Sequence, residues 1–517
     1  MYHLDQPLQP GDSLRLDFDL LYRTKGFKNG NANIDIVQNG TFFTNQYFPG
    51  IGYSEQYELS SDDKRKDNGL KPKERMRAQN DPAGVRQNVF GDDADQIRFA
   101  MTISTTPDQT AIAPGYLQKE WLKTGPDGKK RRYFSYQMDS PIADFYSIVS
   151  ARYLVKKEVY TGKAGNPISL EIYYHPGHPH NLDRMMRGMK ASLAYYQANY
   201  GAFQHRQLRI MEFPRYRSYA QSFANTIPFG EDMGFVADID DKQDIDMPFF
   251  VTAHETAHQW WGHQVTEANV RGSAMLSESL AEYSALMVMK HQYPQERMQE
   301  FLRYELDYYL RGRQSETKKE QPLSQCEGQQ YIHYNKGAHV LYALQDQIGE
   351  DKLNQALRAY RDRWNVARVA QTGIYPTAAD LTSELQAVTP DSLRGLLDDW
   401  VNAITLYELK TDKVTVTPVG KQYDVQVTVS AEKVRADSLG NETKRPINEW
   451  IWIGVYAPKA KGSDSEKLLY YQRHHITKPK QFIIVRVNQK PDRAGIDPMN
   501  LLIDRHPKDN IKAIEMP

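Results

Sequence analysis

The residues best suited to chemistry lie in one short stretch, HETAHQWWGHQV, which runs from His254 to Val265. In an α-helix, residues four apart lie on the same face, so His254 and His258 can present their imidazoles to a single ion. Two neutral imidazoles suit Zn²⁺, and one further protein ligand would leave a fourth position for water, as in catalytic zinc sites. The spacing therefore predicts a metal centre. The alternative is a helix that carries two histidines without a metal.

A third ligand should be a carboxylate from a neighbouring helix. The segment LSESLAEYSALMVMK supplies Glu278 and Glu282, which are four apart on one helical face. One of them can bind the ion, while the other accepts the far N–H of a ligand histidine and so fixes its tautomer. We assign Glu278 as the ligand and Glu282 as the supporting carboxylate, with the reverse assignment left open. The flanking Leu280 and Leu286 indicate a mostly buried helix, which disfavours a solvated acidic face.

The elements that must position these residues fall into three regions. The first ~175 residues alternate short β-type runs, such as SLRLDFDLLY, IRFAMTIST and PISLEIYYH, with turn residues. Two charged stretches within that region, SSDDKRKDNGLKPKERMRAQND and GPDGKKRR, are predicted to be solvated loops because both signs of charge are mixed. From about Asn181 a helical period appears, carried by Met185, Met189, Leu193 and Tyr196.

Helical patterns continue to about Ala403, in GAHVLYALQDQIGEDKLNQALRAYRDRW and AADLTSELQAV, and all the candidate site residues lie in this part. The period then returns to two in KVTVTPV, YDVQVTVSA, WIWIGVYA and FIIVRV, which predicts a β-sandwich. The predicted fold class is therefore multidomain α+β. We expect an N-terminal β domain over residues 1–178, a mainly helical catalytic domain over 179–408 and a C-terminal β-sandwich over 409–517.

Composition excludes several classes of function. The chain has 517 residues with 65 basic and 65 acidic side chains, so its net charge of +0 provides no field that attracts nucleic acid. No apolar run approaches the ~20 residues of a membrane span, and the first residues do not resemble a signal peptide. Cys326 is the only cysteine, which excludes an internal disulfide and a zinc site of four thiolates.

Three motifs together carry a resemblance to a known family. HETAHQWWGHQV, followed by LSESLAEY and later by YNKGAHVLYAL, resembles the aminopeptidase N family of thermolysin-like zinc peptidases. The resemblance implies that His254, His258 and Glu278 bind one Zn²⁺ per chain. It also implies that Glu255 is the general base and that Tyr334 stabilises the transition state. On this basis the middle domain is expected to be thermolysin-like, with peptides as substrates.

The sequence departs from the family pattern at two points. There are 19 residues between His258 and Glu278, one more than is usual in the family, and Ser277 and Ser279 flank the glutamate. The family's Gly-Ala-Met-Glu-Asn strand, whose glutamate binds the substrate's amino terminus, corresponds here to PFGEDMGF. Glu231 then takes the glutamate's place. Because the residues around Glu231 differ from the family's, the chain could be an endopeptidase instead of an aminopeptidase. Glu231 could equally be part of an ordinary acidic turn.

The resemblance also bears on the setting of the chain. LQPGDSLRLDFDL resembles the middle of the family's N-terminal β domain, so the first half of that domain is expected to be absent. Some bacterial proteins that resemble this sequence carry such a segment after a multi-span transporter permease. That likeness implies an extracytoplasmic location and attachment to a transporter membrane domain that lies outside this chain. A competing hypothesis is a catalytically silent module that binds zinc and peptides for such a transporter.

Overall fold

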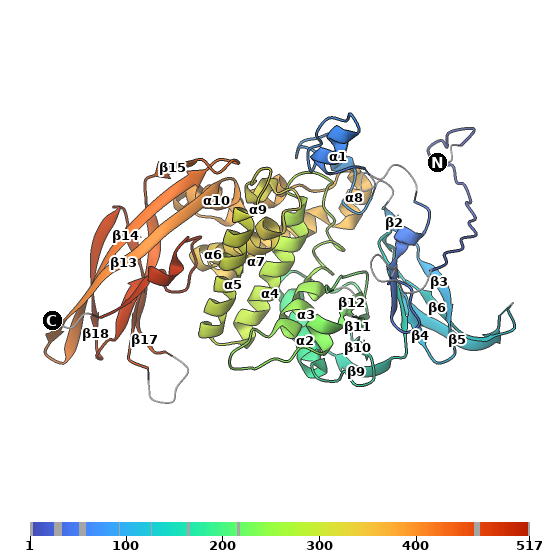
Figure 1. Cartoon of the computed structure of the whole chain (residues 1–517), viewed down its shortest axis with the longest axis horizontal. Helices are drawn as coiled ribbons and strands as arrows, with labels where there is room; N and C mark the ends of the chain where they lie inside the picture. Colours follow the sequence, from blue (N-terminus) through green and yellow to red (C-terminus); the bar gives the residue numbers. More distant parts are fainter. Residues whose placement is uncertain are drawn as a thin grey trace.

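Strands at both ends of the molecule flank a helical middle (Figure 1). The protein is described from a computed structural model, which covers residues 4–24, 34–50, 58–91, 94–125, 127–162, 166–214, 218–459 and 466–514. This arrangement confirms the predicted fold class. The domain boundaries at residues 178 and 408 stay predictions.

The described residues of the N-terminal region form three small antiparallel sheets, with strand orders β1-β8-β4, β3-β6-β5 and β2-β7. Aromatic side chains such as Phe134 and Tyr136 fill its core. The elements are β1 (Thr41–Thr44), α1 (Asp62–Asp67), β2 (Gln96–Ile97), β3 (Ala100–Thr105), β4 (Thr110–Ile112), β5 (Tyr116–Thr124), β6 (Lys130–Gln137), β7 (Ile142–Ala143) and β8 (Ser147–Ala151).

Two predictions for this region were wrong. The run SLRLDFDLLY forms no strand, and its apolar side chains, including Leu14 and Phe18, are about half exposed. The run alternates as a strand would, but within the described residues no strand pairs with it, so no ladder of hydrogen bonds forms. The first charged stretch contains the short helix α1, which Ser61 caps by accepting from the Lys64 N–H, although the helix is solvated as expected.

A mixed sheet with the order β12-β11-β10-β9 begins the middle region. Its strands are β9 (Leu154–Tyr160), β10 (Ile168–Tyr174), β11 (Gln207–Phe213) and β12 (Thr226–Gly230). Strands β10, β11 and β12 run parallel, so their carboxyl ends lie at the same edge. Helix α2 (Leu182–Asn199) connects β10 to β11, and the four residues of its predicted face are fully buried. Strand β11 was not predicted, because it lies inside a stretch where helical patterns dominate.

Helices make up the rest of the middle region, and α2, α3 and α4 pack together. Helix α3 begins where the Asp246 carboxylate accepts the Phe249 N–H at 3.1 Å, and Pro248 occupies its first turn. The helices are α3 (Met247–Ala257), α4 (Leu280–Gln292), α5 (Gln295–Gln314), α6 (Gly337–Ile348), α7 (Glu350–Trp364), α8 (Val366–Thr372), α9 (Ala378–Val388) and α10 (Arg394–Val401). No helix within the described ranges is both long and apolar enough to cross a bilayer.

In the C-terminal region, the residues that the structure describes form two sheets that bury apolar faces, as the alternating pattern predicts. In one sheet β14 pairs with β13, β15 and β18, and the other has the order β17-β16-β19-β20. Inward residues such as Val427 and Ile453 are fully buried in the shared core. The strands are β13 (Ile404–Val419), β14 (Gln422–Ala436), β15 (Glu442–Arg445), β16 (Glu449–Tyr456), β17 (Leu468–Ile476), β18 (Lys480–Val487), β19 (Arg493–Ile496) and β20 (Ile511–Ala513).

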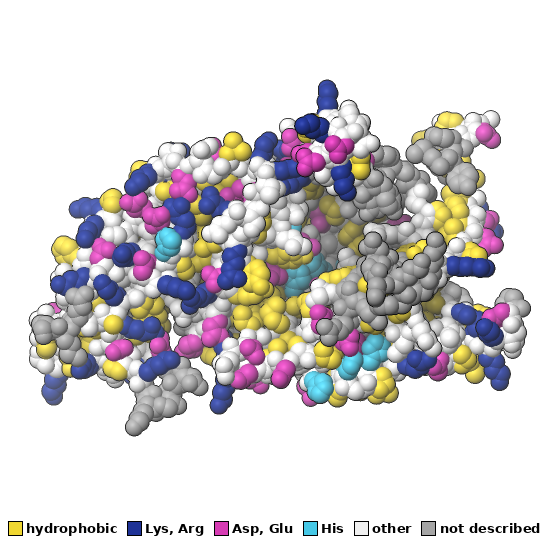
Figure 2. All heavy atoms as spheres, in the orientation of Figure 1, with side chains coloured by type: hydrophobic (Ala, Val, Ile, Leu, Met, Phe, Trp, Pro, Cys, Tyr) yellow, Lys and Arg dark blue, Asp and Glu magenta, His cyan; other side chains and the backbone are white. Residues whose placement is uncertain are grey.

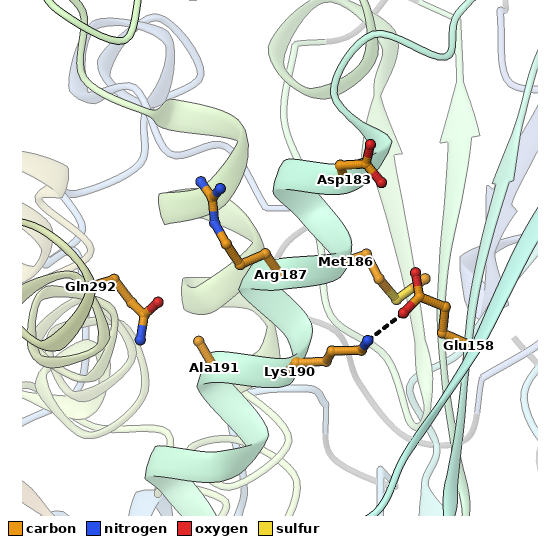
Figure 3. A pocket seen from close by; sticks show the side chains of 7 residues that line it. All are labelled: Glu158, Asp183, Met186, Arg187, Lys190, Ala191 and Gln292. Carbon is orange, nitrogen blue, oxygen red and sulfur yellow. Dashed lines mark hydrogen bonds and ion pairs between the residues drawn. The ribbon is translucent and has the colours of Figure 1, made fainter.

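A surface hollow of about 410 Å³ lies along α2 (Figure 3). Its charged side chains take part in ion pairs: Lys190 contacts Glu158 on β9, and Arg187 lies 3.1 Å from Asp246, the residue that caps α3. This hollow shares no residue with the HETAHQWWGHQV stretch. The hollow is therefore a place where ion pairs connect α2 to β9 and to the start of α3.

Candidate metal centre

The two histidines of the first motif lie at the end of α3. His254 is in the last turn and His258 caps the helix. Their Nε2 atoms are 3.0 Å apart. The helix therefore turns both imidazoles toward one point, as the four-residue spacing predicts. Figure 2 shows histidine side chains in a hollow between the helical middle and the N-terminal strands.

Glu278 lies in a single π-helical turn, Met275–Ser279, directly before α4. Its Oε2 is 3.5 Å from His254 Nε2 and 3.3 Å from His258 Nε2. Tetrahedral zinc with bonds of about 2.0–2.2 Å requires ligand atoms about 3.3 Å apart, so the three atoms match that geometry. Within the described chain, this buried oxygen has no hydrogen-bond donor. Both the donor set and the unpartnered oxygen fit a divalent zinc ion.

The outer nitrogens of the two histidines contact protein acceptors. Glu282 Oε2 lies 2.5 Å from His254 Nδ1, and the carbonyl of Trp261 lies 2.9 Å from His258 Nδ1. Such contacts place the proton on Nδ1 and leave Nε2 free to bind a metal. The structure thus brings Glu282 to the position predicted for a supporting carboxylate and Glu278 to the position predicted for a ligand.

Burial and mutual charge shape the electrostatics of the cluster. Burial works against charge on Glu278, but His258 and His254 outweigh it and hold the pKa of that carboxyl well below its ordinary value. Burial likewise opposes charge on His254, yet Glu282 and Glu278 hold its pKa well above the usual range. Because a metal binds the neutral imidazole, a cation at this point would displace the proton from Nε2 of His254.

Glu255 differs from the other acids of the cluster. Its side chain is buried, and its Oε2 has no hydrogen-bond donor among the residues described. Burial raises the pKa of the Glu255 carboxyl, and the neighbouring His254 and His258 only partly offset that effect. A carboxylate whose proton affinity is raised is suited to accept a proton from water.

Tyr334 lies in a second π-helical turn, Tyr331–Lys336, which leads into α6. Its ring centroid is 5.8 Å from that of His254. Burial, reinforced by the adjacent Glu278 carboxylate, raises the pKa of Tyr334, so its hydroxyl keeps its proton and can donate it in a hydrogen bond.

The turns that hold Glu278 and Tyr334 are fastened to each other. The Ser279 hydroxyl donates to the His333 carbonyl at 2.5 Å. A Cβ at Gly337 would lie 2.1 Å from the Ser279 Oγ, so only glycine permits this approach. The glycine of YNKG is therefore explained by packing between the two turns.

Glu231 lies in a third π-helical turn, Glu231–Phe235, at the end of β12. Its Oε1 is 3.7 Å from Nε2 of His178, and its side chain is 20% exposed. Glu231, Glu278 and Tyr334 thus all lie in π-helical turns, which are often found at functional sites, whereas Glu282 lies in α4.

Sequence reasoning did not identify three groups that interact with the predicted site residues. The Trp261 carbonyl is a backbone group and has no sequence signal. Glu305 is fully buried and accepts from the Asn335 amide at 2.7 Å, and its pKa is raised well above normal by burial and by Glu282. His178 could have been noticed, because it lies in the short motif HPGH.

The middle region matches a known protein family. The model of the peptidase family M1 domain matches residues 181–400. Residues 181–400 thus match the peptidase family M1 domain. This match confirms the resemblance to the aminopeptidase N family, and the three motifs that carry the resemblance lie within it.

Relatives of the M1 domain include proteins from distant organisms. A putative aminopeptidase-2 of Caenorhabditis elegans is 32% identical over 133 residues, which are 25% of this chain and 7% of that protein. A probable aminopeptidase 1 of Sulfurisphaera tokodaii is 23% identical over 209 residues, which are 38% of this chain and 25% of that protein. The matched segments thus span a quarter or less of these two relatives.

The fold is also similar to a solved structure, that of Legionella pneumophila aminopeptidase A in complex with aspartic acid. The similarity covers 82% of this chain and 45% of that chain, with a TM-score of 0.51 and 16% sequence identity. At this identity the likeness concerns the fold, and it extends well beyond the M1 domain on both sides.

Proposed function

We propose that this protein is a zinc-dependent peptidase, and in the first place an aminopeptidase. The observation that carries the proposal is the convergence of three ligand atoms, with separations of 3.0, 3.3 and 3.5 Å, beside a buried glutamate. His254, His258 and Glu278 would hold the ion. Three protein ligands leave a position for water, which a structural zinc site with four protein ligands does not.

The residues around the ion would divide the work of hydrolysis. A bound zinc ion supplies a Lewis acid that polarises the scissile carbonyl and lowers the pKa of water toward ~7. Glu255 accepts the proton of the attacking water and passes it to the leaving amine. The Tyr334 hydroxyl donates a hydrogen bond to the oxyanion that forms on the former carbonyl. Glu282 holds His254 in the tautomer that binds the metal.

Specificity for a free amino terminus is assigned to Glu231. Its partly exposed carboxylate can accept charge-assisted hydrogen bonds from an α-ammonium group. Comparing an amino-blocked peptide with its free-amine form tests this assignment. An aminopeptidase cleaves only the free form, whereas equal rates on both would indicate an endopeptidase.

The Glu255→Gln variant tests the enzymatic proposal. We expect it to keep zinc, because Glu255 is not among the ligands, and to lose about 10²–10⁴-fold in kcat, because the proton acceptor is gone. Zinc is measured by elemental analysis and turnover with an aminoacyl fluorophore, before and after treatment with a chelator. The matched control is Glu300→Gln, which changes a glutamate on α5 that pairs with Arg297.

Two results would contradict this proposal. Full turnover in Glu255→Gln would show that another group accepts the proton. Zinc binding without any hydrolysis in the unaltered chain would favour the silent module that binds zinc and peptides.

From the sequence resemblance alone we further propose an extracytoplasmic location beside a transporter membrane domain. Fractionation of the source cells tests it, with the protein expected at the membrane or outside it. Recovery in the cytoplasm alone would contradict this location.

A further inference from the structure

We infer that His175, His178 and Glu212 form a second site for a divalent metal ion of the Zn²⁺ class. It is separate from the site of His254, His258 and Glu278, which we call the α3 centre. These three residues can offer ligand atoms that all lie within 4.8 Å of one another. Two imidazoles and one carboxylate are the same donor set as in the α3 centre, and this set suits zinc and its neighbours among the transition metals. The inference does not depend on whether the protein hydrolyses peptides.

A tight turn brings the two histidines together. In HPGH, Pro176 and Gly177 occupy the central positions, and Gly177 has φ of +98°. The His178 N–H donates to the His175 carbonyl at 3.1 Å and closes the turn. Proline second and a left-handed glycine third are the signature of a type II β-turn. As a result, the two imidazole rings lie 6.0 Å apart at 78° to each other.

Glu212 comes from the neighbouring parallel strand. Tyr173 on β10 lies opposite Met211 on β11, so the turn after β10 lies beside the end of β11. Glu212 Oε1 is 2.5 Å from His178 Nδ1 and 3.3 Å from His175 Nδ1, and its Oε2 accepts the His175 backbone N–H at 2.5 Å. The carboxyl ends of parallel strands are where ligands bind in open sheets.

The Glu212 carboxylate is deeply buried and lies beside the two imidazoles. The Glu212 side chain is fully buried, and its ion-pair partners within the described chain are these two histidines. The His175 ring stacks on Tyr153 with centroids 5.5 Å apart and 16° between planes, which holds it in place. Because burying a carboxylate is costly unless a positive charge lies beside it, a divalent cation held by these three groups would stabilise this cluster.

The two separations from Glu212 need only a small adjustment to hold the ion. Tetrahedral zinc places ligand atoms about 3.3 Å apart, which the pair of His175 and Glu212 already meets. The pair of His178 and Glu212 must open by less than ~1 Å, and the His178 side chain is 26% exposed, so it has room to move outward.

This second site bears on Glu231, and that consequence rests on the proposed function. With Nδ1 of His178 on a cation, the ring proton must lie on Nε2, which faces Glu231 Oε1 at 3.7 Å. The cation would thus hold the imidazole behind the carboxylate assigned to the substrate's amino terminus. His178 is in this sense a positioning residue.

Counting bound cations in matched variants tests the inference. Zinc-loaded chains, dialysed against metal-free buffer, are analysed for zinc per chain. We expect two ions in the unaltered chain and one in Glu278→Gln, which weakens the α3 centre. We also expect one ion in His175→Phe, which keeps the ring on Tyr153 but removes the ligand nitrogen, and none in the double variant. Glu212→Gln serves as a second probe, and circular dichroism shows whether each variant is folded.

Cobalt gives an independent readout. Glu278→Gln loaded with one equivalent of Co²⁺ should show the visible bands of tetrahedral cobalt, and adding His175→Phe or Glu212→Gln should abolish them. One zinc per chain in the unaltered protein, with none in Glu278→Gln, would overturn the inference and leave a hydrogen-bonded cluster only. A second cation that survives both His175→Phe and Glu212→Gln would overturn it too. Neither result depends on hydrolysis.

Discussion

The two histidine clusters in the described part of the chain are built on different kinds of backbone. In the α3 centre, His254 and His258 are fixed by one helix, and Glu278 by a turn packed against it, with all three separations between 3.0 and 3.5 Å. In the second cluster, His175 and His178 flank a four-residue turn, and the separations from Glu212 are 3.3 and 2.5 Å.

The two kinds of backbone differ in how far they fix the ligand positions before an ion binds. A helix fixes the spacing of i and i+4 side chains through its own hydrogen bonds, so the α3 centre needs little movement to bind an ion. A turn depends on one glycine conformation and on its register with the next strand. We therefore expect the α3 centre to bind zinc more tightly. The cluster of His175, His178 and Glu212, which we call the turn cluster, should exchange zinc faster.

Of the changes that distinguish the two clusters, Tyr334→Phe should have the largest effect, a loss of turnover. This change removes the hydroxyl assigned to the oxyanion, so kcat should fall about 10²–10³-fold while both cations stay bound. Steady-state kinetics and zinc analysis check this. The matched control is Tyr331→Phe, since the Tyr331 hydroxyl donates instead to Glu316 at 3.0 Å. A drop in the control alone would reverse the two assignments.

A smaller effect is expected from Glu282→Gln, which weakens the acceptor at His254 Nδ1. Loss of such a supporting carboxylate typically costs about 10–100-fold in metal affinity. Competition with a zinc chelator measures the affinity, and only the α3 centre should weaken. If zinc at the turn cluster weakened equally, the two sites would not be separate. An unchanged affinity at both would remove the supporting role of Glu282.

The smallest effect should come from Gly177→Ala, which strains the turn between His175 and His178. A Cβ there would meet no atom within 4 Å, so the cost is the left-handed backbone alone, about 1 kcal/mol. Where the turn relaxes in the absence of the ion, the ion must restore the strained conformation, so zinc should bind up to roughly fivefold more weakly at the turn cluster, with the α3 centre unchanged.

The control for that turn is Gly420→Ala, which introduces the same kind of strain at φ of +61° in the hairpin between β13 and β14. It should leave both cation affinities as they are. Equal losses in the two glycine variants would mean that the turn has no specific part in binding.

The sequence predicted most of the α3 centre because helical spacing is local information. His254 and His258 were predicted from a four-residue interval, and Glu278 and Glu282 from another. The M1 match bears out the family, whereas the individual residue roles stay predictions. Glu212 could not be predicted, because its place beside His178 depends on the pairing of β10 with β11.

Other features of the fold were hidden for similar physical reasons. The run SLRLDFDLLY has the alternation of a strand, but alternation does not say whether a partner strand exists. The π-helical turns that carry Glu231, Glu278 and Tyr334 differ from α-helix by a single residue per turn, which a hydrophobic period does not resolve. Local periods therefore predicted the elements, and contacts between elements decided the rest.

The most direct test of the central claim is a crystal structure of the zinc-loaded protein, with anomalous diffraction recorded on both sides of the zinc absorption edge. We predict a zinc peak within about 2.0–2.2 Å of His254 Nε2, His258 Nε2 and a Glu278 carboxylate oxygen. No zinc peak at that point, with His254 and Glu278 hydrogen-bonded to each other instead, would contradict the account.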